Sequence, residues 1–176
     1  MQALEYPTTA SLSVDSPETT IQRWQIIRDK APLRQIYDEW YLTIASSLPG
    51  GDEPVLELGS GAGFMSTYVP NLITTDILEL PGLGRVMDAC APWPFPDDSL
   101  RAVAMVNTLH HLHDVTAFFR EAIRCLTPGG VISMIEPWNS WWSRFVYGRL
   151  HPEPFDPRAD SWSFRSDGPL SDANVA

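Results

Sequence analysis

Apolar side chains recur every three or four residues between about Pro17 and Leu48, a spacing that predicts amphipathic helices. Pro32 falls inside this stretch. Because proline lacks the N–H that a helix interior needs, we expect two helices rather than one. The sequence Pro49-Gly50-Gly51 ends the second of them. Two further helices are expected, one from Asp114 to Leu126 with Asp114 as its N-cap and one from Trp138 to Leu150.

Five short apolar or β-branched segments predict strands, at residues 55–58, 72–75, 85–87, 102–106 and 131–135. The fourth is apolar throughout, as expected of a strand buried on both faces. Because the strands alternate with helices or loops, we expect a parallel sheet with crossover connections. Residues 77–84 are too few for a helical crossover between the second and third strands. A loop must therefore replace the helix there, or the third strand is very short.

Three glycines alternate at positions 59, 61 and 63, directly after the first predicted strand, in the sequence VLELGSGAGFMS. Glycine allows a tight turn and lets a ligand approach the bare backbone. We expect a helix to begin after this turn, with its free N–H groups facing a carboxylate or a phosphate. A purely structural glycine turn is the alternative. Position 64 is Phe, whereas a dinucleotide-binding fingerprint requires its third glycine there.

The glycine segment and the segments that follow it resemble, in order, the motifs of class I S-adenosylmethionine-dependent methyltransferases. The resemblance covers about residues 30–137 and is greatest to the small-molecule branch that includes ubiquinone-pathway and sugar-pathway enzymes. It rests on Glu57-Leu58-Gly59-Ser60-Gly61-Ala62-Gly63, Asp76 at the end of the second strand, Asp88-Ala89, Pro-Phe-Pro-Asp-Asp-Ser at 94–99, Asn107-Thr108-Leu109-His110-His111, Phe119-Arg120-Glu121-Ala122 and Leu126-Thr127-Pro128-Gly129-Gly130.

This resemblance implies an α/β fold, the Rossmann-like open parallel sheet of the class I methyltransferase type. That sheet has seven strands, the last two in an antiparallel hairpin. The sequence predicts only five, so strands 6 and 7 are missing from the expected fold. We divide the chain into a mobile N-terminal arm at residues 1–18, a methyltransferase domain with an N-terminal helical cap at residues 19–150, and an irregular or truncated tail at residues 151–176.

The resemblance also implies S-adenosylmethionine as the cofactor, together with a set of residues that bind it. Gly59, Gly61 and the helix after them would meet the methionine end, and Asp76 would accept both ribose hydroxyls. Asp88 would accept from the adenine amino group, beside the backbone N–H of Ala89. The acidic groups suit a cationic sulfonium. The full predicted set is Glu57, Gly59, Ser60, Gly61, Gly63, Asp76, Asp88, Ala89 and Asn107.

Methyl transfer is an in-line displacement, so the protein mainly positions the nucleophile and supplies a base where a hydroxyl must be deprotonated. His110 and His111 follow the fourth predicted strand, at the edge where open α/β sheets bind ligands, and are the candidate catalytic residues. The alternative is that neither histidine takes part in catalysis. We expect no metal site from His110, His111 and His113, because adjacent side chains diverge.

The charge of the chain argues against nucleic acid as the acceptor. Lys and Arg total 12 against 22 Asp and Glu, a net charge of -10, whereas nucleic-acid binding depends largely on cations. Residues 107–110 also lack the Asn-Pro-Pro-aromatic motif of methyltransferases that act on nucleic-acid or glutamine amines. A small-molecule acceptor is therefore expected.

The sequence gives no sign of a membrane span or of export. No apolar run approaches the roughly 20 residues that cross a membrane. Residues 1–20 lack the basic start and apolar core of a secretory signal, and Cys90 and Cys125 form no Cys-x-x-Cys pair. We therefore expect a cytoplasmic protein without a transmembrane segment.

Aromatic residues cluster after the fifth predicted strand, and packing against the sheet is the favoured explanation. A substrate lid or a peripheral contact with a membrane is the alternative. Bare sheet edges, left by the missing strands, would favour a homo-oligomer. The aromatic residues are Trp138, Trp141, Trp142, Phe145 and Tyr147.

The sequence therefore predicts an enzyme that transfers a methyl group from S-adenosylmethionine to a small-molecule acceptor. Because two strands of the family fold are missing, a non-catalytic module that binds S-adenosylmethionine or a partner is the alternative. An NAD-dependent oxidoreductase is disfavoured by Phe64 and by the absence of a Tyr-x-x-x-Lys pair.

Overall fold

The N-terminal part of the chain forms two helices, α1 (Pro17–Asp29) and α2 (Ala31–Ser47). The hydroxyl of Ser16 caps α1 by accepting a hydrogen bond from the N–H of Thr19 at 3.3 Å. Pro32 lies in the first turn of α2, where its missing N–H would have no helical partner, so the prediction of two helices divided near Pro32 is confirmed. The computed structural model describes residue 13 and residues 15–61, 63–138 and 140–149.

The five strands of the described residues form one parallel sheet in the order β3-β2-β1-β4-β5, which confirms the predicted α/β fold. From β1 the chain moves outward through β2 to β3 and then returns to β4 on the other side of β1. Ligands of such sheets bind at the carboxyl ends of the strands, next to this reversal. The strands are β1 (Val55–Leu58), β2 (Leu72–Asp76), β3 (Arg85–Val86), β4 (Leu100–Val106) and β5 (Leu126–Ile135).

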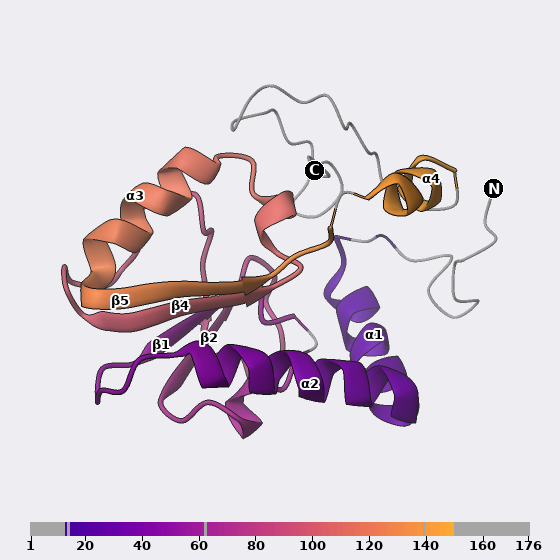
Figure 1. The fold of residues 1–176 in the computed structure, drawn as a ribbon, viewed down its shortest axis with the longest axis horizontal. Coiled ribbons are helices and arrows are strands. Elements are labelled where there is room, and N and C mark those ends of the chain that lie inside the picture. Colours follow the sequence, from indigo (N-terminus) through magenta and orange to yellow (C-terminus); the bar gives the residue numbers. More distant parts are fainter. Residues whose placement is uncertain (1–12, 14, 62, 139, 150–176) are drawn as a thin grey trace.

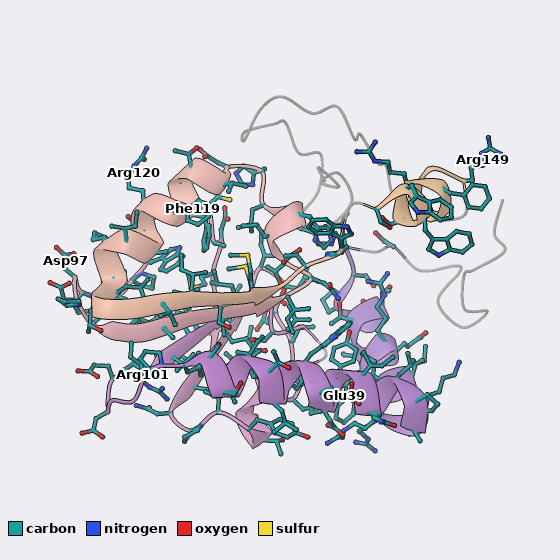
Figure 2. The ribbon with its side chains drawn as sticks, viewed as in Figure 1. Glu39, Asp97, Arg101, Phe119, Arg120 and Arg149 are labelled. Atoms are coloured by element: carbon teal, nitrogen blue, oxygen red, sulfur yellow. The ribbon has the colours of Figure 1, made fainter. Side chains whose placement is uncertain are left out.

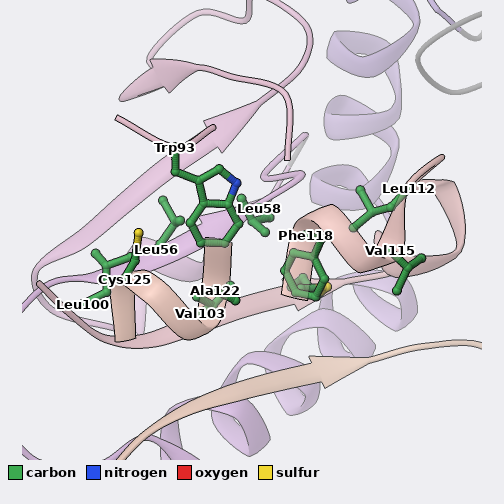
Figure 3. Close-up of a cluster of buried hydrophobic side chains, with 11 residues drawn as sticks. Leu56, Leu58, Trp93, Leu100, Val103, Leu112, Val115, Phe118, Ala122 and Cys125 are labelled. Atoms are coloured by element: carbon green, nitrogen blue, oxygen red, sulfur yellow. The ribbon is translucent and has the colours of Figure 1, made fainter. Parts of the chain in front are cut away.

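Helices cover both faces of the sheet and give three layers (Figure 1). On one face α2 buries Tyr41 in a cluster with side chains of β1 and β4. On the other face lies α3 (Val115–Cys125), and Figure 3 shows its Phe118 in a second cluster with Trp93 and strand residues. The carboxylate of Asp114 caps α3 as predicted.

The connection between β2 and β3 contains no helix, as the length of residues 77–84 led us to expect, and β3 has only two residues. The start of β5 differs from the prediction. Leu126 pairs with Leu100 and Val131 pairs with Ala102, so residues 127–130 bulge opposite a single residue of β4. The segment predicted to lie before the fifth strand is therefore a bulge within it, which Gly129 permits with φ of 87°.

The helix predicted after the glycine segment does not form. Residues 63–71 contain one short 3-10 turn, η1 (Met65–Thr67). Pro70 explains this, because proline disfavours helical geometry in the residue before it, and Asn71 then adopts φ of 55° directly before β2. The expectation that a helix N-terminus offers free N–H groups to a ligand is therefore wrong.

α4 (Trp141–Arg149) stands apart from the sheet (Figure 1). The prediction that the aromatic cluster packs on the sheet is wrong, because its described members are exposed: Trp138 by 83%, Trp141 by 80%, Trp142 by 58% and Phe145 by 43%. The side chain of Tyr147, and residues 150–176, where the irregular tail was expected, lie outside the described residues. None of the helices within the described ranges is both long and apolar enough to span a membrane.

Candidate functional site

A cavity of about 460 Å³ opens at the carboxyl ends of β1, β2 and β4, next to the reversal in strand order. Its walls come from the glycine segment, the loops after β3 and before α3, and the helices α1 and α2. His111 lines it, whereas His110 is not among the lining residues. The role of each residue remains a prediction, but the whole predicted cofactor set lines this one cavity: Glu57, Gly59, Ser60, Gly61, Gly63, Asp76, Asp88, Ala89 and Asn107.

The glycine segment forms a turn that only small residues can occupy. Gly59 and Gly61 adopt left-handed backbone conformations, with φ of 62° and 47°. A Cβ on Gly59 would lie 2.5 Å from Oγ1 of Thr108, and one on Gly63 would lie 2.7 Å from the carbonyl oxygen of Ser60. The alternating glycines are therefore required by the backbone and by their close neighbours.

The turn is attached to the end of β2 through Ser60 and Thr75. The N–H of Ser60 donates to the carbonyl of Thr75 at 2.8 Å, and the N–H of Thr75 donates to Oγ of Ser60 at 3.0 Å. The hydroxyl of Thr75 also donates to the carbonyl of Glu57 at 2.6 Å. These bonds hold the glycine turn in a fixed position beside Asp76.

Asp76, at the end of β2, accepts hydrogen bonds with both carboxylate oxygens. Oδ2 accepts from the N–H of Gly61 at 2.8 Å and Oδ1 accepts from the N–H of Leu78 at 2.9 Å. Burial raises the pKa of Asp76, and the backbone hydrogen bonds offset part of that effect. The N–H of Gly61 therefore faces Asp76 rather than a ligand. Each carboxylate oxygen of Asp76 can still accept one further hydrogen bond.

Glu57, the third residue of β1, is buried with only 4% of its surface exposed. Burial raises the pKa of Glu57 to about 7; the nearby charge of Asp76 adds to this effect, and a hydrogen bond with Ser60 offsets part of it. The carboxyl group therefore holds its proton well above the pH at which an exposed glutamate loses it.

Glu57→Gln is expected to stabilise the protein by about 2–3 kcal/mol more at pH 8 than at pH 5. The folded state keeps the proton of Glu57 up to about pH 7, while the unfolded chain releases it near 4.5. The stability that this raised pKa contributes is complete below 4.5 and is lost as the pH rises through 7. Glutamine resembles the protonated acid and does not suffer this loss.

Urea unfolding at the two pH values measures the difference between variant and wild type. Glu39→Gln is the matched control, because Glu39 lies on the exposed surface of α2 (Figure 2). A Glu57→Gln effect that does not change with pH would show that Glu57 is already ionised at pH 5.

Asp88, Cys90 and His113 form another wall of the cavity. Oδ1 of Asp88 accepts from the N–H of Cys90 at 2.8 Å, and the N–H of Asp114 donates to Sγ of Cys90 at 3.4 Å. One ligand atom from each of the three residues lies within 4.8 Å of the others, a grouping that the sequence analysis did not identify. Burial raises the pKa of the Cys90 thiol, which disfavours the thiolate that binds metals, and the adenine contact of Asp88 remains a prediction.

Glu136 follows β5 and binds the segment after β4 with both carboxylate oxygens. Oε1 accepts from the N–H groups of Thr108 and Leu109, each at 2.8 Å, and Oε2 lies 2.5 Å from Nδ1 of His110. Burial alone would raise the pKa of Glu136, but these hydrogen bonds outweigh it and lower the pKa. An ionised carboxylate only accepts, so Nδ1 of His110 carries a proton, and Nε2 is the acceptor atom whenever the ring is neutral.

The helices α1 and α2 line the cavity with residues that the sequence analysis did not identify. Helical periodicity marks a buried face, and it does not distinguish a face packed on the sheet from one that borders a cavity. The predicted helical cap therefore forms part of the site. Its lining residues are Thr20, Arg23, Ile26, Ile27, Leu33, Tyr37 and Tyr41.

Comparison with known families identifies this arrangement. Residues 56–134 match the family model of the methyltransferase domain, a span that runs from β1 into β5 and includes Asp76 and Asp88. This match covers a little under half of the chain, and it supports the class I S-adenosylmethionine-dependent methyltransferase family that the sequence resemblance indicated. That family implies S-adenosylmethionine as the cofactor, as the sequence resemblance did. A comparison with curated proteins gives no match.

Several solved structures share the fold of this chain. A methyltransferase of Thermotoga maritima, a possible histamine N-methyltransferase, has a TM-score of 0.52 and 20% identity over 72% of this chain and 62% of its own. For a candidate methyltransferase of Methanococcus maripaludis the TM-score is 0.52 and the identity 15%, over 70% and 66%. For the carbon methyltransferase CurJ they are 0.51 and 20%, over 84% and 46%. The chain thus spans about half to two thirds of the length of these proteins.

Proposed function

We propose that this protein transfers the methyl group of S-adenosylmethionine to a small-molecule acceptor, with the cofactor bound in the cavity beside the glycine turn. The observation that carries the proposal is the convergence of the glycine turn, Asp76 and Asp88 on that single cavity. When bound, the cofactor supplies a methyl group that its sulfonium has already activated. The protein holds the cofactor and the acceptor in the geometry that the transfer requires.

The residues of the cavity fit the groups of the cofactor. Asp76 keeps a lone pair on each oxygen, which suits a ribose diol, and Oδ2 of Asp88 remains for an adenine amino group. Gly59 and Gly61 carry no side chain that would separate the backbone from the methionine part. The acidic character of the walls also favours a ligand with a sulfonium cation.

The structure contains a feature that disfavours NAD. Phe64 occupies the position of the third glycine of a dinucleotide fingerprint. Its ring lies 3.8 Å from the guanidinium of Arg34 and 5.0 Å from the ring of Tyr41, both on α2. The bulky side chain is thus part of the packing between the glycine segment and α2, where the fingerprint needs a bare backbone.

We propose His110 as the base that deprotonates the acceptor, and Glu136 as the residue that positions it. The proposal is supported by the tautomer of His110 that Glu136 favours. Glu136 accepts from Nδ1, which keeps a proton there, and Nε2 is then the atom that can accept a proton. The His110 ring lies 4.2 Å from the ring of His111, which lines the cavity, so both predicted histidines stand at the same edge. The net charge of -10 supports a small-molecule acceptor over nucleic acid, and we place the protein in the cytoplasm from its sequence alone.

Thermal unfolding with different ligands tests the cofactor. A ligand that binds only the native state raises the melting temperature, and at 100 times its Kd it adds about 2.7 kcal/mol, which corresponds to several degrees. We expect S-adenosylmethionine and S-adenosylhomocysteine to give this shift and NAD to give none. An absent shift with both adenosyl ligands, or an equal shift with NAD, would contradict the proposal. Binding without methylation of any acceptor would favour the non-catalytic alternative.

A further inference from the structure

The carboxylate of the proposed cofactor has fewer partners in the structure than the sequence predicted for it. The expected helix N-terminus is replaced by the three-residue turn η1. Of the two predicted glycine contacts, Gly61 already donates its N–H to Oδ2 of Asp76, which leaves Gly59. Because a carboxylate that leaves water needs strong donors, we expect a charged group of the cavity to contribute as well.

The described residues that line the cavity carry more acidic than basic groups. Glu57, Asp76 and Asp88 supply carboxyl groups, and Arg23 of α1 is the one lysine or arginine among the described lining residues. Arg23 takes part in none of the ion pairs found within the described ranges of the chain. The guanidinium is therefore available to a ligand anion.

The position of α1 brings Arg23 to the methionine end of the site. Cγ2 of Thr20 lies 3.9 Å from the point where a Cβ on Gly61 would stand, so α1 lies close to the glycine turn. Arg23 follows Thr20 by three residues, and side chains at that spacing share one face of a helix. Arg23 and Tyr37 both line the cavity, and Arg23 is also exposed at the surface of α1.

We propose that Arg23 binds the carboxylate of the methionine part of S-adenosylmethionine, so that α1 is a wall of the cofactor site. The planar guanidinium can donate two parallel hydrogen bonds to a carboxylate. Arg23 lies outside residues 56–134, the span that the family model matches. The inference rests on the proposed function, and its test separates the failure of one from the failure of the other.

Calorimetry with two ligands that differ by one group isolates the contact. S-adenosylmethionine carries the carboxylate, and decarboxylated S-adenosylmethionine is the same molecule without it. The wild type is expected to prefer S-adenosylmethionine by about tenfold or more, because a hydrogen bond to a charged group contributes roughly that factor. In Arg23→Gln this preference is expected to disappear, with S-adenosylmethionine about tenfold weaker and the decarboxylated ligand unchanged or tighter.

Arg28→Gln is the matched control, because it removes the same charge from the same helix at a residue that does not line the cavity. The guanidinium of Arg28 lies over the ring of Trp24 at 4.3 Å. This variant is expected to keep the wild-type preference, and melting temperatures check that all three proteins are folded.

Three results would overturn the inference. The preference for the carboxylate could persist in Arg23→Gln, which would assign the contact to another residue. Both ligands could weaken equally, which would show that Arg23 acts through the packing of α1. The wild type could bind S-adenosylmethionine without any preference, in which case the site does not recognise the carboxylate. A wild type that binds neither ligand refutes the proposed function itself, and this inference with it.

Discussion

Asp76→Asn is expected to weaken the binding of S-adenosylhomocysteine about 100-fold, the largest effect on affinity that the site predicts. Two ribose hydroxyls would share the carboxylate with the N–H groups of Gly61 and Leu78, so four donors meet one charged group. Asparagine offers one carbonyl oxygen, and its NH₂ group faces donors in place of the second. Each hydrogen bond to a charged group contributes roughly 1.5–3 kcal/mol, and losing one or two accounts for the change.

Isothermal titration calorimetry measures this loss, and Asp52→Asn is the matched control because Asp52 lies exposed in the turn before β1. Thermal unfolding without ligand separates a loss of binding from a loss of fold, since the buried N–H groups of Gly61 and Leu78 also depend on Asp76. A folded Asp76→Asn protein with wild-type affinity would show that the ribose is not held at the end of β2.

The strands could be predicted from the sequence because strands buried on both faces leave short, continuous apolar segments. All four residues of β1 are buried, as are residues 100–105 of β4. Their order in the sheet could not be derived in this way. Val55 pairs with both Leu72 and Ala102, and no local pattern encodes which distant segments become neighbours. The sequence analysis therefore predicted a parallel sheet without the order of its strands.

In the site, too, some residues can be predicted from the sequence and others depend on distant contacts. Residues at or directly after the end of a strand, such as Gly59, Asp76 and Asn107, were predicted from the family resemblance, and the carboxyl ends of parallel strands bring them to one edge. Glu136 also directly follows a strand, but its role depends on its contact with the segment after β4. Arg23 could not be identified, because its place in the site depends on how α1 packs near the glycine turn.

Two errors have physical causes that are visible in the chain. Pro70 already limits any helix between the glycine segment and β2, and its effect was not included in the prediction. The aromatic residues of α4 were assigned to the core because large apolar side chains are usually buried, yet Trp141 is 80% exposed. Apolar composition alone does not show which surface a helix meets.

His110→Gln is expected to lower kcat by about 100-fold or more while changing the affinity for S-adenosylhomocysteine little, because general bases contribute factors of roughly 10²–10⁴. The effect should appear with an acceptor whose nucleophilic atom must lose a proton. Mass spectrometry of incubations with methyl-labelled cofactor identifies such an acceptor. His111→Gln is the comparison, since it removes the neighbouring ring and leaves the bond between Nδ1 of His110 and Glu136 in place.

Glu136→Gln is expected to lower kcat by a similar factor, although it removes no base. The amide oxygen of glutamine can still accept from the N–H groups of Thr108 and Leu109, so the segment after β4 keeps its position. The NH₂ group then faces Nδ1 of His110 as a donor, which forces the ring proton onto Nε2 and leaves that atom unable to accept one. Nitrogen NMR of the imidazole reports this change without any acceptor, with the proton on Nδ1 in the wild type and on Nε2 in the variant. If the tautomer changes and kcat does not, His110 is not the base, and Glu136 serves only to hold the loop.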